Sequence, residues 1–281
     1  MSLKEAMLRP YGAPLRWAHR GTVRTQLGTV AMVDRFRARH TAEDDAWLAE
    51  RLTITAKTFL RPATARRMVR TARRTFTGPI VIADDSPEPM AAPDELTTVV
   101  ALPFNSGVPR GRNAALAAVA TPYAMITDDD VVFTAASDLL GAVAYLEDNP
   151  DVDAVCATLI ELPRWYRWPY GDERELLPGH LAPLRAFGEV IDGLPVVMKG
   201  PQVFVGRADA LREVPYDENI RMVDHRDFFS SAAGRLVFVQ DPGLVVFHAR
   251  TPFDKEYTSY RDDVTSDMAY LAGKWRRPPV D

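Results

Sequence analysis

The chain has 281 residues and 47% of them are hydrophobic, enough for one large core close to the size at which a single core stops growing. Its 34 lysines and arginines against 38 aspartates and glutamates leave a formal net charge of −4, which argues against a protein that coats nucleic acid. The single cysteine, Cys156, excludes an internal disulfide and a cysteine-based zinc site, and its apolar surroundings favour a buried thiol.

No stretch of the chain approaches the roughly 20 apolar residues of a membrane-spanning helix. The N-terminus also lacks the apolar region and the cleavage pattern of a signal peptide. We therefore expect a cytoplasmic protein with no transmembrane segment. The weakly basic, amphipathic run around Leu15, Arg16, Trp17 and Arg20 leaves peripheral membrane contact as an alternative to a solvated segment. The abundance of arginine and alanine favours a bacterial source.

From residue 51 onwards, strand-like runs alternate with runs of helix-forming residues, whereas residues 1–50 predict no particular element. The predicted strands cover 51–56, 79–85, 96–103, 123–130 and 152–162, and the predicted helices cover 62–76, 111–120 and 136–150. Such an alternation is typical of βαβ units in an α/β fold with a mostly parallel sheet whose faces are covered.

Beyond residue 162 the pattern changes. An aromatic, charged and proline-rich stretch predicts an excursion over the site, and later segments predict paired strands about Gly200, a helix ended by Gly234 and two strands about a turn. These four segments are 163–180, 190–211, 223–234 and 236–250. We expect three parts in all: an N-terminal extension packed on the domain, the main domain, and a C-terminal tail or lid whose basic end is mobile, at 1–50, 51–250 and 251–281.

The run YAMITDDDVVF, residues 123–133, places three consecutive aspartates at the end of a buried strand. Like charges repel and lose hydration there, so we infer that a compensating positive charge is missing from the sequence. In an extended chain Asp128 and Asp130 point the same way and Asp129 points away. Two such carboxylates suit Mg²⁺ or Mn²⁺ with phosphate oxygens completing the coordination, as in the D-x-D motif of nucleotide-sugar enzymes. The alternative is a solvated acidic turn.

Two more polar clusters fall at predicted strand ends, where ligands bind in open parallel sheets. Within FNSGVPRGRN (104–113), glycines permit tight backbone geometry, while Arg110 and Arg112 supply positive charge before a helix N-terminus. This loop suits a diphosphate or a base, or is an ordinary basic loop. Asp84 is a candidate acceptor for a uracil N–H or a ribose hydroxyl, and a capping or turn role for Asp85 and Ser86 is the alternative.

Candidate general bases lie in VDHRDFF, where Asp224 and Asp227 are three residues apart and share one helical face. Either carboxylate could take a proton from an acceptor hydroxyl. The alternative is a pair of acids favoured by the dipole at a helix start. His248, at the end of a strand, is a candidate third metal ligand or else a structural histidine, and His225 is interpreted as structural.

On these residues the chain resembles a GT-A glycosyltransferase, and more specifically the ganglioside β1,4-N-acetylgalactosaminyltransferase family (family 12). The matching stretches occur in the order that the family has. They are LTITAKTFLR (52–61), IVIADDS (80–86), PFNSGVPRGRN (103–113), DDDVVFT (128–134), VFVGRAD (203–209), RMVDHRDFF (221–229) and VVFHA (245–249).

The resemblance implies a Rossmann-like GT-A sheet with a smaller antiparallel portion on the acceptor side. It also implies an inverting transfer of a sugar from a UDP-sugar donor to an acceptor hydroxyl, with Mn²⁺ or Mg²⁺ as cofactor. Metal ligation would fall to Asp130 and His248, and Asp227 is the first choice as base with Asp224 the second. The residues that would bind the nucleotide sugar are Thr55, Lys57, Asp84, Asp85, Arg110, Arg112, Asn113, Asp128, Asp129 and Gly200.

The sequence departs from the family pattern in two places. No N-terminal membrane anchor of the animal members is visible, and residues 163–195 do not match. The acceptor therefore stays open among glycans, glycolipids and small molecules, and the aromatic run RWYRWPY (164–170) either stacks on a sugar ring or packs internally.

Two other functions remain as alternatives, a nucleotidyltransferase and a non-catalytic binding protein. A nucleotidyltransferase that makes an activated sugar would carry a glycine-rich loop after its first strand, and ITAKTFLR has no glycine. A non-catalytic protein that binds nucleotides or carbohydrates would have no need of the intact acids at 128, 130, 224 and 227.

Overall fold

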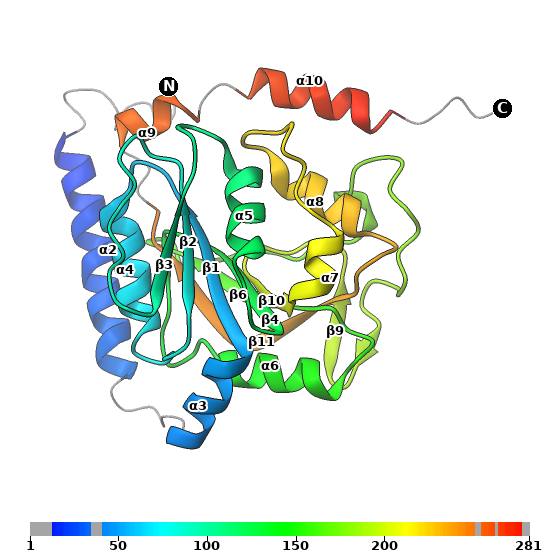
Figure 1. The fold of residues 1–281 in the computed structure, drawn as a ribbon, viewed down its shortest axis with the longest axis horizontal. Coiled ribbons are helices and arrows are strands. Elements are labelled where there is room, and N and C mark those ends of the chain that lie inside the picture. The colour runs from blue at the N-terminus through cyan, green and yellow to red at the C-terminus, as the bar shows by residue number, and fades with distance from the viewer. Residues whose placement is uncertain (1–12, 35–40, 251–253, 262–263, 277–281) are drawn as a thin grey trace.

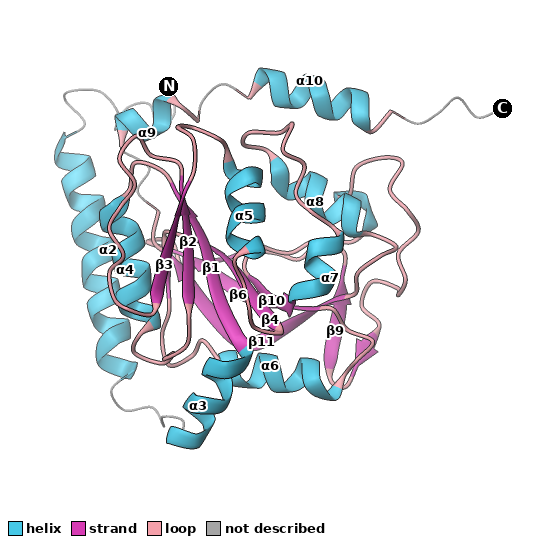
Figure 2. Ribbon diagram, in the orientation of Figure 1, coloured by secondary structure: helices cyan, strands magenta, loops and turns pink. Residues whose placement is uncertain are grey.

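The computed structural model describes residues 13–34, 41–250, 254–261 and 264–276. In this part of the chain one mixed sheet runs through the molecule in the order β3-β2-β1-β4-β10-β6-β11-β9-β8, with helices on both faces (Figures 1 and 2). The strands along this path are β1 (Leu52–Thr58), β2 (Ile80–Asp84), β3 (Thr97–Ala101), β4 (Tyr123–Asp128), β6 (Ala154–Glu161), β8 (Val190–Ile191), β9 (Leu194–Val197), β10 (Phe204–Arg207) and β11 (Phe238–His248). Two short strands, β5 (Val131–Val132) and β7 (Tyr166–Arg167), pair at its side.

The parallel half of the sheet is the part that the sequence predicts. β1 lies between β2 and β4, parallel to both, and β2 is parallel to β3. The register places Lys57 opposite Asp128 and Thr58 opposite Asp84, so the polar strand ends meet at one edge. The sequence interpretation of these strands is therefore confirmed.

The two faces of this half are covered by different helices. Alternate residues of β2 point to opposite faces, so Ile80 and Ile82 enter the main core while Val81 and Ala83 pack against Ala115. Ala115 belongs to α5 (Val108–Ala117). The main core also holds the buried sides of α3 (Ala42–Arg51), α4 (Pro62–Ala72) and α6 (Leu139–Asp148). Both faces are dry, and for that reason every residue of β1 is buried.

The second half of the sheet corrects two sequence predictions. The strands on either side of Gly200, β9 and β10, are not paired with each other. β10 lies antiparallel between β4 and β6, whereas β9 pairs with β8 and β11. Residues 236–250 do not fold into two strands about a turn. β11 is one strand that runs parallel to β6 along its whole length. The predicted turn is instead a β-bulge between Asp241 and Val245, where the register shifts but the chain does not reverse direction.

Helices not predicted from the sequence precede the sheet. α2 (Ala13–Asp34) buries Val23 with Val132, Leu162 and Phe247, and α3 begins with a capping box between Thr41 and Asp44. None of the helices described combines the length and the apolar character that crossing a membrane requires. The predicted boundaries of the N-terminal and C-terminal parts stay predictions.

Helices α7 (Ala208–Glu213), α8 (Asp224–Ala232), α9 (Lys255–Ser259) and α10 (Thr265–Lys274) complete the fold. Aromatic rings join α8 to the sheet: Phe228 stacks on Phe204 with ring centroids 5.8 Å apart, and Phe238 meets Phe204 edge-on at 5.6 Å. α9 and α10 lie across the end of the molecule where β1 and β2 terminate (Figure 1).

Replacing Phe204 with alanine tests this aromatic junction. The ring is fully buried between β10 and α8, so its removal should lower the free energy of unfolding by about 3–5 kcal/mol. Urea denaturation followed by circular dichroism measures the loss. Phe187→Ala, which removes a half-exposed ring, is the matched control. Equal midpoints for the two variants would contradict the proposed role of the cluster.

Candidate functional site

A cavity of about 760 Å³ opens at the carboxyl ends of the strands. Its walls come from the ends of β1, β4 and β11, from the loop before β10, from the start of α8 and from the segment around α9. Its charged and titratable lining includes Lys57, Arg61, Asp128, Asp130, Asp224 and His248. This is the edge at which ligands bind in open α/β sheets.

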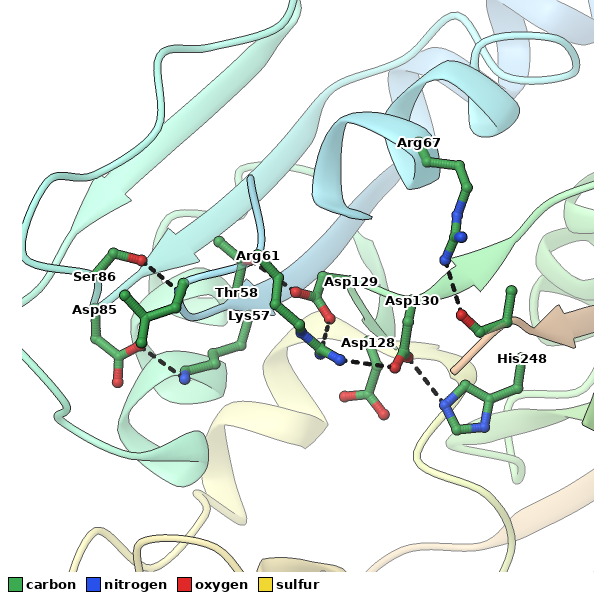
Figure 3. A network of polar contacts seen from close by, with 12 residues as sticks. Lys57, Thr58, Arg61, Arg67, Asp85, Ser86, Asp128, Asp129, Asp130 and His248 are labelled. Atoms are coloured by element: carbon green, nitrogen blue, oxygen red, sulfur yellow. Dashed lines mark hydrogen bonds and ion pairs between the residues drawn. The ribbon is translucent and has the colours of Figure 1, made fainter. Parts of the chain in front are cut away.

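The acidic run forms a turn between β4 and β5, with its first member at the end of β4. Asp128 and Asp130 line the cavity, whereas Asp129 is fully buried beneath it. Asp129 accepts a hydrogen bond of 2.7 Å from Thr58 Oγ1 and pairs with Arg61 (Figure 3). Asp128 and Asp130 therefore share one side and Asp129 lies on the other, as predicted. The backbone here is a turn, however, and not the extended chain from which this was predicted.

The positive charge that compensates the acids is in the sequence, so the inference that it is missing is wrong. Arg61 reaches Asp129 and also donates to Asp130 Oδ2 over 3.1 Å (Figure 3). Its guanidinium lies 4.0 Å from the ring centroid of Tyr257, in cation–π geometry. Arg61 is the N-cap residue of α4, four residues after Lys57. The sequence offers only its position close behind the first strand as a signal, and nothing there marks Arg61 as buried.

Burial and neighbouring charges shift the pKa values of this cluster in different directions. Burial raises the pKa of Asp129 to about 6 against the opposing effect of Arg61. Burial also acts on Asp130, but His248 and Arg61 outweigh it and hold the pKa of Asp130 well below its usual range. The pKa of His248 is raised, because Asp130 overcomes the effect of burial on the imidazole. The cluster is therefore strongly polarised, with Asp130 as its permanent anion.

A second cation, Arg112, organises the other side of the cavity. Its Nη2 donates to Asp128 Oδ1 over 2.7 Å, and its Nη1 lies 3.2 Å from Asp224 Oδ2. Arg112 sits on the second turn of α5, whose N-cap Gly107 has a φ of +97° that favours glycine. The Gly107 N–H donates to Asp85, which in turn pairs with Lys57 Nζ at 2.7 Å. One chain of contacts thus links β1, β2, α5 and α8.

Asp130 and His248 have the geometry of a pair that shares a divalent cation. His248 Nε2 lies 3.0 Å from Asp130 Oδ1, yet that oxygen makes no aligned hydrogen bond. Adjacent ligands about 2.1 Å from an octahedral ion lie about 3.0 Å apart. The described part of the chain brings no three acids, histidines or cysteines together as a complete metal site. Two protein ligands fit an ion that water and a bound phosphate would complete.

Several predicted nucleotide-sugar residues serve the framework in this structure. Both carboxylate oxygens of Asp84 accept backbone N–H groups, from Ser86 at 2.9 Å and Met90 at 2.8 Å. Thr55 donates its hydroxyl to the Met125 carbonyl at 2.9 Å. These contacts favour structural roles, and the predicted donor contacts of Asp84 and Thr55 stay predictions.

Two predicted residues of α5, Asn113 and Arg110, also do not line the cavity. Asn113 donates to the Tyr216 carbonyl at 2.8 Å and accepts from the Tyr216 N–H at 2.9 Å. Arg110 is exposed and lies 3.6 Å from Glu218. Their predicted contacts with the nucleotide sugar stay predictions, whereas Arg112 of the same helix lines the cavity.

Gly200 borders the cavity at a point with little room for a side chain. A Cβ there would meet Cys156 Sγ and Tyr170 at 3.2 Å. Its carbonyl lies 2.5 Å from Nε2 of His225, a residue that also lines the cavity. The glycine thus lets the loop before β10 pack closely against Cys156 of β6 and against Tyr170.

The two candidate bases have different surroundings. Asp224 lines the cavity, and burial raises its pKa against the effect of Arg112. Asp227, one helical turn on, is held by Lys274 Nζ at 2.8 Å and by Trp275 Nε1 at 2.7 Å. The structure thus separates two residues that the sequence left on one face.

The C-terminal segment fastens itself to this region at several points. Asp267 of α10 accepts backbone N–H groups just before α8, the shortest from Met222 at 2.7 Å. Tyr257, Thr258 and Arg261 reach the cavity wall. The sequence had marked residues from 274 as part of a mobile tail. Lys274 contacts Asp227, and residues 277–281 lie outside the described part.

Arg61→Met is expected to lower the free energy of unfolding by about 3–5 kcal/mol, because two buried carboxylates lose their cation. Adding Asp129→Asn should restore part of that loss, since it removes one of the stranded charges. Chemical denaturation of the single and double variants measures both effects, with the exposed Arg66→Met on the same helix as control. An Arg61→Met protein as stable as this control would refute the assignment.

Known proteins are similar to this chain in sequence and in fold. The model of "Glycosyl transferase family 2" matches residues 57–214. Mouse beta-1,4 N-acetylgalactosaminyltransferase 1 is 33% identical over 242 residues, which cover 79% of this chain and 45% of that protein. The chain spans less than half the length of the curated relatives it matches. No relative tests the predicted cytoplasmic location or bacterial source.

Solved structures share the fold at low identity. S. aureus TarS 1–349 in complex with UDP-GlcNAc has a TM-score of 0.55 and 12% identity, covering 82% of this chain and 68% of that one. GalNAc-T7 with UDP, GalNAc and Mn²⁺ has a TM-score of 0.53 and 12% identity, covering 75% and 47%. The expected GT-A fold and the resemblance to β1,4-N-acetylgalactosaminyltransferases are confirmed. The chain belongs to glycosyl transferase family 2.

Proposed function

We propose that this protein is an inverting, metal-dependent glycosyltransferase that moves a sugar from a UDP-sugar to an acceptor hydroxyl. The observation that carries the proposal is the cavity at the strand ends, where Asp130 and His248 face the buried cations Arg61 and Arg112. Positive charge stabilises a bound diphosphate. It stabilises the leaving diphosphate more strongly, because negative charge develops there as the bond to the sugar breaks.

The donor side of the cavity is the side with β1 and α5. Lys57 comes from the end of β1, Arg61 from the N-cap of α4 and Arg112 from α5, and Arg261 adds a fourth cation. Phosphate oxygens of a UDP-sugar would share these cations with the acids that contact them in this structure. The neighbours solved with UDP-GlcNAc, or with UDP and GalNAc, support a donor of this class.

Mn²⁺ or Mg²⁺ would be held by Asp130 and His248, and when bound it would neutralise charge on the leaving diphosphate. A neighbour solved with Mn²⁺ supports this cofactor class. Arg61 keeps Asp130 Oδ2 in place from the opposite side, which leaves Oδ1 for the cation. The protein thus contributes orientation, and the substrate contributes further oxygen ligands.

We assign the general base to Asp224 and reverse the order of preference that the sequence gave. Asp224 lines the cavity, whereas both oxygens of Asp227 are engaged by Lys274 and Trp275. In the proposed reaction Asp224 takes the proton of the acceptor hydroxyl. The hydroxyl oxygen then bonds to the anomeric carbon opposite the C–O bond that breaks, UDP leaves, and the configuration inverts.

The acceptor would enter beside the aromatic excursion after β6. Trp168 and Tyr170 line the cavity, so a sugar ring can stack on them, whereas Trp165 and Tyr166 are half-exposed and Trp165 packs edge-on against Phe247. The acceptor class proposed is a glycan, a glycolipid or a small molecule with a free hydroxyl.

UDP release from a panel of UDP-GalNAc, UDP-GlcNAc, UDP-Glc and UDP-Gal with Mn²⁺ tests the reaction class. Turnover of one donor, measured by a coupled UDP assay, is the expected result. Release of pyrophosphate from a nucleoside triphosphate and a sugar phosphate would instead identify a nucleotidyltransferase. Binding of a donor without turnover, even with acceptors supplied, would identify a non-catalytic protein.

Asp224→Asn should reduce kcat about 10²–10⁴-fold, because the acceptor of the hydroxyl proton is lost. The same change removes a carboxylate 3.2 Å from Arg112, so UDP affinity is measured in parallel. Asp227→Asn is the matched comparison on the same helix, and it should retain more activity than Asp224→Asn. Steady-state kinetics with saturating donor, together with calorimetry for UDP, separates the two effects. A larger loss of kcat in Asp227→Asn would return the base to Asp227.

A further inference from the structure

Glu161 is a buried carboxylate beside the metal pair, and neither the proposed reaction nor the fold accounts for it. It ends β6 and is only 4% exposed. β11 runs parallel to β6, and the register places His248 directly opposite Glu161. A charge at such a position costs free energy unless a partner compensates it.

The two carboxylate oxygens of Glu161 have different environments. Oε1 accepts a hydrogen bond of 2.5 Å from Arg164 Nη2, which fixes the carboxylate. Oε2 is buried and has no hydrogen-bond partner, with Arg250 Nη1 at 3.8 Å. Buried acceptors without partners are rare in folded proteins, so this atom calls for an explanation.

The complementary group lies on the neighbouring strand. His248 Nδ1 is 4.0 Å from Glu161 Oε2, and it too is buried without a hydrogen-bond partner. On the other side of the same ring, Nε2 faces Asp130 Oδ1 at 3.0 Å. The imidazole therefore stands between two carboxylates, one inside the cavity and one behind it.

We propose that Glu161 is a positioning residue that accepts a hydrogen bond from His248 Nδ1–H and so presents the Nε2 lone pair to the divalent cation. This inference rests on the proposed metal-dependent function. A separation of 4.0 Å is too long for a hydrogen bond, so the ring must approach Glu161 by about 1 Å when the cation binds.

The physical reason lies in the chemistry of neutral imidazole. The ring carries one N–H, and its position decides which nitrogen has a lone pair for a metal. A carboxylate behind Nδ1 holds the proton there and makes Nε2 a better donor, as in carboxylate–histidine–metal arrangements generally. Arg164 anchors Glu161 from the surface, since its own side chain is 70% exposed.

Mn²⁺ affinity in the presence of saturating UDP tests this role, with free Mn²⁺ followed by electron paramagnetic resonance. Glu161→Ala should bind Mn²⁺ about 10–100-fold more weakly than the wild type. Glu161→Gln keeps an acceptor oxygen but loses the charge, so it should fall between the two. Glu189→Ala, which removes a carboxylate outside the cavity that pairs with Arg185, should match the wild type.

A double-mutant cycle shows whether Glu161 acts through the histidine. In a His248→Ala background, Glu161→Ala should produce no further loss of Mn²⁺ affinity. UDP affinity measured in chelator should stay unchanged in the Glu161 variants, which separates a metal effect from damage to the donor site.

The outcomes are distinct. Unchanged Mn²⁺ affinity in Glu161→Ala, or an equal loss with and without His248, would overturn the positioning role and leave the proposed function intact. A wild-type protein that binds no Mn²⁺ with UDP present would overturn both. If Glu161→Ala fails to fold, the Mn²⁺ affinity of Glu161→Gln, alone and combined with His248→Ala, decides.

Discussion

The structure depends on one electrostatic constraint, the placement of three aspartates where a buried strand meets a cavity. Arg61 satisfies this constraint by bridging Asp129 and Asp130 from the first turn beyond β1. A buried ion pair of this kind is costly to break, because removal of one partner strands the other in a poor solvent. The parallel pairing of β1 with β4, which brings the two loops together, is therefore fixed by charge as well as by hydrogen bonds.

A second guanidinium, that of Arg112, links the acidic turn to the other side of the cavity. Arg112 contacts Asp128 of the acidic turn and Asp224 of α8, so the donor side and the proposed base share one cation. α8 is held in turn by the C-terminal segment, through Asp267 before its first residue and through Asp227 within it. Movement of α10 would thus change the surroundings of Asp224 without any direct contact with substrate.

Sequence patterns predicted the parallel half of the sheet because β1, β2 and β4 are almost continuously buried runs. The common edge of Asp85, Arg112 and the acidic turn followed from strand direction alone. Three features could not be predicted. The pairing of β9 and β10 depends on partners distant in the chain, Arg61 has no periodicity that marks it as buried, and the choice between Asp224 and Asp227 depends on where α10 lies.

Arg61 balances the acidic turn when no donor is bound, and we propose that a cation shared with the diphosphate adds to this balance when donor is bound. Calorimetry of UDP binding in Mn²⁺ and in chelator measures this directly. We predict at least tenfold tighter binding in Mn²⁺, about 1.4 kcal/mol, and loss of that difference in Asp130→Ala. Equal UDP affinity in the two buffers, with no effect of Asp130→Ala, would contradict the account.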